Sequence, residues 1–290
     1  MFRHAIVRPP ARNFADGLTT AQLGQPDFAR ALDQHAAYCE ALAACGLALT
    51  WLDADERFPD STFVEDTAVM VQDFAEHPIV IDSDTHALPH GGATALEPAA
   101  TRVILTRPGA GSRAGEVESI AEALGRLNPP PQLHSIQEPG TLDGGDVCEV
   151  ERDGKSHFFI GVSVRTNEAG ARQLAETLAS FGCTATLVDI RRMKNILHLK
   201  SGLAYLGDQR LVVIDALADD EAFRGFELIR VNASEQYAAN CVRVNDRVLV
   251  AAGFPEFEQT LQSLDYQTIA LEMSEFQKMD GGLSCLSLRF

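Results

Sequence analysis

The sequence has 290 residues, of which 46% are hydrophobic, so it can bury a sizeable core in one large domain or two small ones. Its formal charge of −17, from 24 basic and 41 acidic residues, argues against non-specific nucleic-acid binding, which depends on a basic surface. The same charge favours a site that attracts cations. No apolar run approaches the ~20 residues of a membrane helix, and the start has no recognisable targeting segment, so we expect no membrane partner.

The six cysteines lie at positions 39, 45, 148, 183, 241 and 285, without a regular spacing. A chain of this length needs no disulfides, and no Cys-x-x-Cys pair suggests structural zinc. We therefore expect reduced cysteines, a cytoplasmic location and no cofactor.

In the first quarter of the chain the hydrophobic pattern predicts a strand over 4–8, a loop over 9–25 and a helix over 26–44. Pro26 suits the first turn of this helix and Gly46 suits its end. Two further strands are predicted at the end of this region, over 47–52 and 67–71.

Residues 72–101 break this rhythm, because prolines and glycines recur through them. We expect a loop here, with a short strand at 79–81. His86 and His90 are four residues apart, which on a helix would suit a metal ion. Pro89 argues against such a helix, so the sequence does not favour a metal site in this segment.

The rest of the chain contains four more predicted helices, over 112–127, 167–181, 219–226 and 255–264. Short strands are predicted at 102–106, 133–136, 147–150, 157–162, 185–188, 196–198, 202–206, 211–214 and 268–271, with a hairpin over 242–250.

Five helices, each among several short strands at intervals of roughly 40 to 90 residues, suit an architecture built by radial repetition. A doubly wound α/β sheet is the competing fold, since strands alternate with helices. The first strand is not followed by Gly-x-Gly-x-x-Gly, which argues against a dinucleotide-binding fold. The pattern alone does not decide between the two architectures.

The C-terminal stretch holds a candidate nucleophile. Gly281 and Gly282 stand just ahead of Cys285, and glycine permits a turn that a ligand can approach closely. Residues 286–290 alternate between apolar and polar side chains, as a half-buried strand does. On its own, Cys285 also suits the alternative interpretation of a small buried core residue.

Other reactive residues lie far away in the sequence. His198 interrupts an apolar run, Asp143 opens an Asp-Gly-Gly motif that recurs at the C-terminus, and Asp60, Glu65 and Asp66 form a cluster. A cysteine, a histidine and several carboxylates are the components of a nucleophilic site that folding assembles. Taken singly, the histidine suits a core position and each acid suits a solvated loop.

In their order and spacing these motifs resemble the dimethylarginine dimethylaminohydrolase family of the guanidino-group-modifying superfamily. The resemblance covers nearly the whole chain and rests on residues 16–19, 58–66, 106–110, 140–147, 165–167, 197–200, 237–241 and 279–290. It implies one catalytic domain over 1–290, folded as a five-bladed α/β propeller (pentein) with ββαβ modules around a central active site. Against the family pattern, residues 72–101 resemble a loop insertion.

The resemblance also implies what each candidate residue does. The catalytic set is Cys285 as nucleophile, His198 as proton donor and Asp143. The substrate-binding set is Leu18, Asp60, Glu65, Asp66, Arg113, Arg165 and Met279.

Within these sets the family pattern assigns particular contacts. Carboxylates recognise a planar guanidinium through two oxygens, and the resemblance gives this role to Asp66 and Asp143. Some family members have glutamate in place of Asp143, so whether it or Asp146 is the closer ligand stays open. Arg113 and Arg165 offer a fork to the substrate's α-carboxylate. Leu18 is expected on a mobile lid, and residue 279 is expected to make a backbone contact.

The implied reaction hydrolyses asymmetric dimethylarginine and monomethylarginine to citrulline and dimethylamine or methylamine. Cys285 attacks the guanidinium carbon, His198 protonates the leaving amine, and a covalent Cys-thiouronium is then hydrolysed. The reaction requires no metal and no cofactor. A zinc ion captured by Cys285 and His198 is expected to inhibit it.

Two departures separate this sequence from related enzymes. Arginine deiminases and amidinotransferases usually place an aspartate where Lys200 stands, so one fewer carboxylate is expected to leave room for methyl groups. Agmatine deiminases typically have histidine where Ser284 stands.

A deiminase acting on arginine or another guanidino compound is the alternative function. A remote alternative is a non-catalytic propeller that binds a partner, as in ribosome-binding relatives, which the Cys–His pair and the acidic charge disfavour. The small-molecule substrate is the expected partner, with no nucleic acid, and the sequence leaves a homodimer open.

Overall fold

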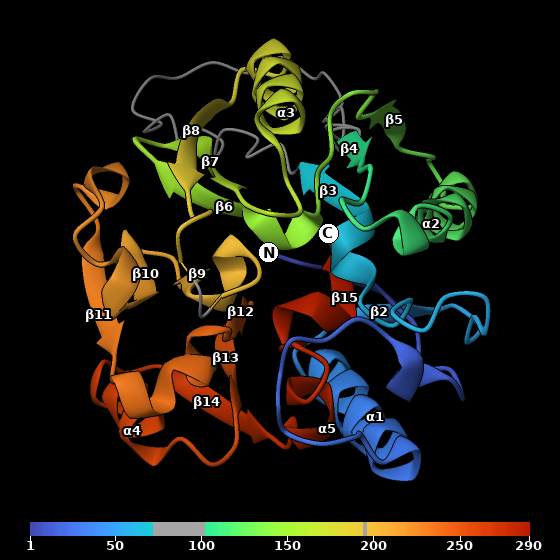
Figure 1. The fold of residues 1–290 in the computed structure, drawn as a ribbon. Helices are drawn as coiled ribbons and strands as arrows, with labels where there is room; N and C mark the ends of the chain where they lie inside the picture. Colours follow the sequence, from blue (N-terminus) through green and yellow to red (C-terminus); the bar gives the residue numbers. More distant parts are fainter. Residues whose placement is uncertain (72–101, 194–195) are drawn as a thin grey trace, which may run out of the picture.

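The computed structural model describes residues 1–71, 102–193 and 196–290, and the predicted insertion at 72–101 lies outside them. In these ranges the chain is an α/β protein with five sheets of three strands each. Figure 1 shows the sheets arranged around a common centre, near which both chain termini lie.

All five sheets share one pairing pattern, in which the middle strand is antiparallel to one neighbour and parallel to the other. The first sheet has the order β15(Ser287–Arg289)-β1(His4–Val7)-β2(Ala48–Trp51), so the last strand of the chain completes it. The other four are β3(Ala68–Val71)-β4(Arg102–Leu105)-β5(Gln132–Ser135), β6(Val147–Arg152)-β7(Lys155–Val162)-β8(Thr184–Asp189), β9(Leu203–Tyr205)-β10(Arg210–Ile214)-β11(Glu227–Val231) and β12(Val242–Val244)-β13(Arg247–Ala251)-β14(Gln267–Leu271).

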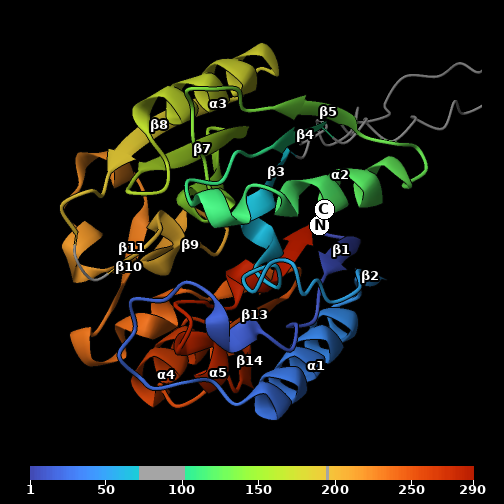
Figure 2. The same cartoon turned by 45° about the vertical axis from the view of Figure 1, so that its right-hand side comes forward.

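Helices form the crossovers that parallel strand pairs require. They are α1(Phe28–Ala44), α2(Glu116–Gly125), α3(Glu168–Ser180) and α4(Pro255–Ser263), and they lie at the periphery in Figures 1 and 2. Asp27 begins α1 by accepting a hydrogen bond from the Arg30 amide at 2.9 Å, and Asn167 begins α3 in the same way.

The fourth sheet departs from the predicted elements. Its crossover contains the 3-10 turns Asp215–Leu217 and Glu221–Phe223 instead of the helix predicted over 219–226. The segment is too short for a stable α-helix, and Gly225 ends it with a φ of +97°. Residues 196–198, predicted as a strand, form no strand, while β11 and the short helix α5(Ser274–Gln277) had not been predicted.

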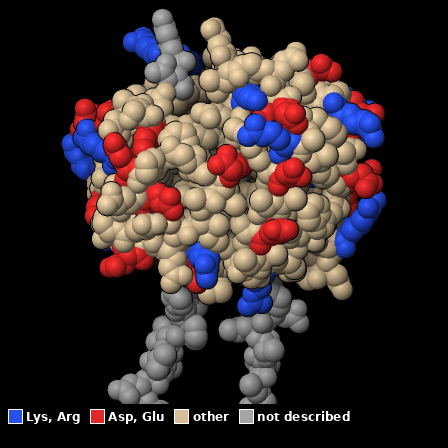
Figure 3. All heavy atoms as spheres, turned by 90° about the horizontal axis from the view of Figure 1, so that it is seen from below, with Lys and Arg blue, Asp and Glu red and all other residues tan. Residues whose placement is uncertain are grey.

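Burial explains why the middle strands hold the sheets together. In β7 every residue after Lys155 is buried, because both faces of this strand are covered, and Phe158 and Phe159 are fully buried there. Acidic and basic side chains are interspersed on the face shown in Figure 3. Within the described ranges, none of the helices combines the length and the apolar character needed to cross a membrane.

Candidate active site

Cys285 lies in the 3-10 turn Ser284–Leu286, directly before β15. Its amide donates a 3.2 Å hydrogen bond to the Gly282 carbonyl, and the residue is only 9% exposed. Neither preceding glycine has room for a side chain: a Cβ on Gly281 would lie 2.2 Å from Phe63, and one on Gly282 would lie 2.5 Å from Asn240. The two glycines therefore let the cysteine turn pack closely against its neighbours.

His198 precedes the 3-10 turn Leu199–Ser201 and is buried. Its ring Nε2 lies 3.0 Å from Oδ2 of Asp143, and its Nδ1 lies 4.0 Å from Oδ1 of Asp66. Asp146 fixes the turn itself, because its Oδ1 accepts the Leu199 amide at 2.9 Å. Asp143 thus contacts the ring, whereas Asp146 holds the backbone next to it.

The surroundings of His198 favour its charged form. Burial alone would lower the pKa of the imidazole, but the carboxylates of Asp66, Asp143 and Asp146 outweigh burial and raise it to about 9. At neutral pH the ring is therefore an imidazolium that can donate a proton.

Asp66 faces this imidazolium as a carboxylate. Burial alone would raise its pKa, but the positive charges of His198 and Arg113 outweigh burial and lower it to about 2. Its Oδ1 accepts the Gly145 amide at 2.8 Å, and its Oδ2 lies 2.5 Å from Nη1 of Arg113. Asp66 is consequently ionised at any physiological pH.

The thiol of Cys285 is protonated in this state of the protein. Burial, followed by the negative charges of Glu65 and Asp66, raises its pKa to about 12. A thiolate is the reactive form of cysteine, so a positive charge brought next to the sulfur would activate it.

These side chains surround a small cavity of about 20 Å³. Such a volume is room for a single water molecule. It is lined by Leu18, Asp60, Phe63, Asp66, Arg113, Arg165, Leu197, His198, Met279, Asp280, Gly281 and Cys285. Of the ten site residues predicted from the sequence, all in the described part of the chain, only Asp143 and Glu65 are missing from this lining.

Asp143 lies behind His198 instead of facing the cavity. Its Oδ1 accepts the Gly109 amide at 2.7 Å and its Oδ2 is the partner of the imidazole. It is fully buried, and its two bonds suit it to orient the imidazole. In this arrangement neither Asp143 nor Asp146 lines the cavity, whereas Asp66 does, and the guanidinium contacts stay predictions.

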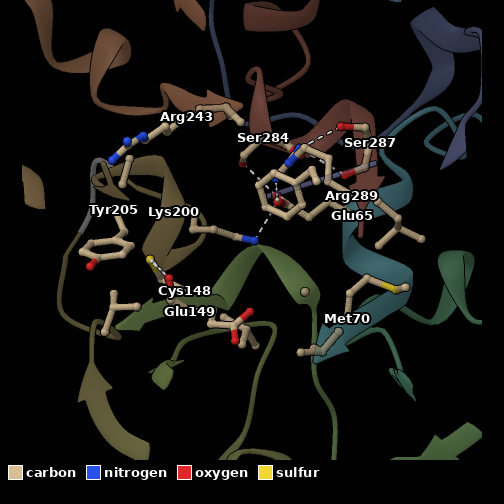
Figure 4. Close-up of a pocket in the computed structure, with 18 of the residues that line it drawn as sticks. Glu65, Met70, Cys148, Glu149, Lys200, Tyr205, Arg243, Ser284, Ser287 and Arg289 are labelled. Carbon is tan, nitrogen blue, oxygen red and sulfur yellow. Dashed lines mark hydrogen bonds and ion pairs between the residues drawn. The ribbon is translucent and has the colours of Figure 1, made fainter. Parts of the chain in front are cut away.

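Glu65 points to the opposite side from Asp66. Its Oε1 lies 2.6 Å from Nζ of Lys200, and its Oε2 accepts the Ser284 hydroxyl at 2.7 Å. Glu65 and Lys200 line a second cavity, shown in Figure 4. Neither Glu65 nor Lys200 lines the cavity that holds Cys285 and His198, and the substrate contact of Glu65 stays a prediction.

The guanidinium of Arg113 is fully engaged within the protein. Besides Asp66, it pairs with Glu116, to which Nη2 donates at 2.7 Å and Nε at 3.1 Å. Nη2 also donates to the Phe63 carbonyl at 3.1 Å. Glu116 was missed from the sequence, although its spacing of three residues from Arg113 was visible. In this state Arg113 offers no free fork for a carboxylate.

The loop that carries Leu18 covers the cavity. The Leu18 amide donates to Oδ1 of Asp60 at 3.0 Å, and the Thr20 hydroxyl donates to Oδ2 of Asp280 at 2.9 Å. Leu18 itself is 40% exposed. A few polar contacts hold this loop down, which suits the predicted lid.

Comparison of the sequence with known proteins agrees with the geometry of this site. No family model matches the chain. It is 41% identical over 290 residues, all of this chain and all of the relative, to the N(G),N(G)-dimethylarginine dimethylaminohydrolase of Pseudomonas aeruginosa. The chain belongs to the dimethylarginine dimethylaminohydrolase family. A member of the family from Streptomyces coelicolor is 31% identical, over 99% of this chain and 96% of its own.

Solved structures give the same result. A variant of the Pseudomonas aeruginosa family member in complex with citrulline superimposes with a TM-score of 0.84, at 40% identity over the whole of both chains. The N-terminal domain of a cyanobacterial arginine dihydrolase superimposes with a TM-score of 0.80 over 100% of this chain and 97% of its own. Its identity is 16%, so this second likeness concerns the fold alone.

Gly145 is a site residue that the family motif contains but that we had not singled out. A Cβ at this position would lie 2.7 Å from Nδ1 of His198 and 2.8 Å from Oδ1 of Asp66. We expect Gly145→Ala to lower kcat by about 100-fold, because a displacement of about 1 Å in a catalytic group has that effect. Citrulline production from dimethylarginine measures the change.

Gly125→Ala is the matched control, since no atom lies within 4 Å of its added Cβ. It should leave kcat within about twofold. Unchanged turnover in Gly145→Ala would mean that the positions of His198 and Asp66 are not critical.

Proposed function

We propose that the protein hydrolyses Nω-methylated arginines, namely asymmetric dimethylarginine and monomethylarginine, to citrulline and dimethylamine or methylamine. The observation that carries this function is one cavity that holds a cysteine, an imidazolium and an ionised aspartate. It occurs in a chain 41% identical to a dimethylarginine dimethylaminohydrolase over its whole length.

In the proposed reaction the substrate guanidinium first pairs with Asp66. Its positive charge lies next to Cys285 and lowers the pKa of the thiol, which is otherwise held at about 12. The thiol proton passes to solvent, and the thiolate then attacks the central carbon to give a tetrahedral adduct. His198 donates its proton to the departing amine, and a thiouronium remains on the cysteine.

The neutral imidazole next takes a proton from water, and the resulting hydroxide attacks the same carbon. Collapse of this second adduct breaks the C–S bond and releases citrulline and the thiolate. Asp143 orients the imidazole through both proton transfers by its 3.0 Å contact with Nε2.

Substrate entry requires a change at Arg113. Asp66 already has the guanidinium of Arg113 at 2.5 Å, and the cavity holds about 20 Å³. We propose that the substrate guanidinium replaces the Arg113 guanidinium on Asp66. The displaced Arg113 then pairs, together with Arg165, with the α-carboxylate of the substrate.

This exchange predicts opposite effects for two kinds of ligand. N,N-Dimethylguanidine lacks the α-carboxylate, so Arg113→Gln should bind it about tenfold more tightly, because Asp66 is no longer occupied. The same variant should raise the KM for dimethylarginine by about tenfold or more. Inhibition constants and steady-state kinetics measure both effects.

Arg165→Gln is the control, because Arg165 lines the same cavity but is not among the described partners of the Asp66 carboxylate, which are Gly145, Arg113 and His198. It should raise the KM for dimethylarginine and leave the inhibition constant of the guanidine unchanged. If wild type and Arg113→Gln bind N,N-dimethylguanidine with equal affinity, the proposed replacement of Arg113 on Asp66 is wrong. The proposed hydrolysis would not be contradicted by this result.

A deiminase of arginine is the second candidate function. The sequence argued against it through Lys200, but this side chain pairs with Glu65 and borders the other cavity. Selection for methylated nitrogens must therefore come from the residues around Asp66. Citrulline formation from arginine and from dimethylarginine, measured side by side, distinguishes the functions, and a preference for arginine would refute ours.

We propose that zinc inhibits the enzyme and that turnover needs no metal. Ligand atoms of Asp66, Asp143 and His198 lie within 4.8 Å of one another, and Cys285 lines the same cavity as His198. A zinc ion captured there would occupy the groups that the reaction uses. Micromolar zinc should reduce turnover and a chelator should restore it, whereas loss of activity in metal-free protein would contradict the mechanism.

Three further proposals concern the domain arrangement, the location and the oligomeric state of the protein. We propose a single catalytic domain over 1–290 with the five-bladed pentein arrangement, supported by the pairing pattern that all five sheets share. None of the six cysteines, all of which lie in the described ranges, forms a disulfide, which supports a reducing, cytoplasmic location. We also propose a homodimer, supported by the exposed Trp51 on the edge strand β2, and light scattering of the purified protein tests it.

A further inference from the structure

A second cavity of about 470 Å³ lies among the inner strands of the five sheets (Figure 4). One antiparallel-paired strand of every sheet contributes to its lining: β3, β6, β9, β12 and β15. Its volume lies within the range of small-molecule sites. The proposed reaction uses none of this space.

The wall between the two cavities consists of Glu65, Lys200 and Ser284. Each belongs to the same turn as a reactive residue: Glu65 precedes the guanidinium-binding aspartate, Ser284 precedes the nucleophile, and Lys200 follows the proton donor by two positions. The Lys200 ammonium and the Ser284 hydroxyl both bind the Glu65 carboxylate, at 2.6 and 2.7 Å. The Glu65 carboxylate thus links Lys200 to the turn that carries the nucleophile, and Nη2 of Arg289 also lies 3.4 Å from this carboxylate.

The cavity is positively charged although the chain carries −17 overall. Its cations are Lys200, Arg243 and Arg289, and its acids are Glu65 and Glu149. Burial raises the pKa of Glu149 to about 8, against the opposing hydrogen bond from Ser156, so this acid is largely neutral at pH 7. Within the lining, three cations then face one carboxylate, while Arg243 also pairs with Asp208 outside it at 3.3 Å.

Apart from the polar side chains of Tyr205, Asn245, Ser284 and Ser287, the rest of the lining is largely apolar. It includes Met70, Val147, Phe158, Leu203 and Leu288, which have no charge to offer a polar ligand. A ligand that suits both parts has one anionic end and an apolar body. Arg243, whose side chain is 33% exposed, connects the lining to the protein surface.

We propose that this cavity binds a small aliphatic monocarboxylate of about six carbons and that its occupancy slows turnover at Cys285. The carboxylate pairs with the Lys200 ammonium and competes with Glu65 for it. Glu65 then shifts, and with it the Ser284 hydroxyl, which lies 3.9 Å from Sγ of Cys285. The kinetic part of this proposal rests on the proposed function, whereas the binding part does not.

Hexanoate is the probe, with hexanamide and hexylammonium as uncharged and cationic controls of the same length. Calorimetry on the wild-type protein should show hexanoate binding at least about tenfold more tightly than either control. With dimethylarginine as substrate, hexanoate should lower kcat at least threefold and leave KM within twofold. Absence of hexanoate binding up to 10 mM, or binding equal to that of hexanamide, would overturn the proposal.

Two variants locate the bound hexanoate. Ala204 on β9 lines the cavity and is 7% exposed, so Ala204→Phe takes up part of it and should weaken hexanoate binding at least tenfold with basal kcat within about twofold. If that variant does not fold by circular dichroism, Arg243→Gln should weaken hexanoate binding at least fivefold. Hexanoate inhibition that raises only KM and survives both substitutions would place the anion in the catalytic cavity and refute the proposal.

The proposed hydrolysis and the proposed binding of a monocarboxylate can be refuted independently of each other. A protein that turns over no methylated arginine would contradict the proposed reaction, and calorimetry would still test the cavity. A further outcome is that hexanoate binds the wild-type protein more tightly than Ala204→Phe, and yet leaves the wild-type kcat unchanged. This result would overturn the proposed coupling between the cavity and Cys285.

Discussion

Cys285→Ser should reduce kcat for dimethylarginine by at least about 1,000-fold, while the dissociation constant of the substrate stays within about threefold. Serine keeps the shape of the side chain, so the contacts of Asp66 and the arginines are preserved. Its hydroxyl is a far weaker nucleophile than a thiolate, and the buried surroundings that raise the thiol pKa to about 12 disfavour an alkoxide even more. Citrulline assays and calorimetry measure the two quantities.

Cys183→Ser is the control, because Cys183 is partly exposed and does not line the catalytic cavity. It should leave both quantities unchanged. Retention of a tenth of the wild-type activity in Cys285→Ser would show that the nucleophile lies elsewhere.

His198→Asn should lower kcat for dimethylarginine by about 100- to 10,000-fold, the usual contribution of a general acid–base group. The wild-type ring is an imidazolium up to a pH of about 9, and asparagine cannot protonate the leaving amine or deprotonate water. The measurement is single-turnover kinetics with dimethylarginine.

S-Methyl-L-thiocitrulline separates this chemical role from a structural one. A variant of a dimethylarginine dimethylaminohydrolase that is 40% identical to this chain has been solved as an adduct with this compound. Its thiol leaving group needs no proton, so His198→Asn should still form the adduct on Cys285 and then accumulate it. Failure to form the adduct in a correctly folded variant would mean that His198 shapes the site instead of transferring protons.

The residues that meet in the cavity were predicted because the motifs that carry them are local and resemble those of a known family. Cys285, His198 and Asp66 each lie in or beside a short turn, and turn chemistry is visible in sequence. The regular helices α1, α3 and α4 were predicted for the same reason, from caps and apolar spacing.

Side-chain direction could not be predicted in the same way. Glu65 and Asp66 are neighbours in one 3-10 turn, yet they face different cavities, because Lys200 and Gly145 bind them from distant parts of the chain. The pairing of Arg113 with Asp66 likewise depends on tertiary contacts. The crossover before β11 was predicted incorrectly because apolar spacing does not distinguish a 3-10 turn from a short helix.

Mass spectrometry of protein quenched during turnover of dimethylarginine tests the central claim most directly. The proposed mechanism predicts an added mass on the peptide that contains Cys285, equal to the substrate minus dimethylamine. This added mass should disappear when the substrate is exhausted. The same adduct should persist in His198→Asn after reaction with S-methyl-L-thiocitrulline. The assignment of Cys285 as nucleophile would be contradicted if the protein is active while its Cys285 peptide stays unmodified throughout turnover. It would also be contradicted if the adduct lies on another cysteine.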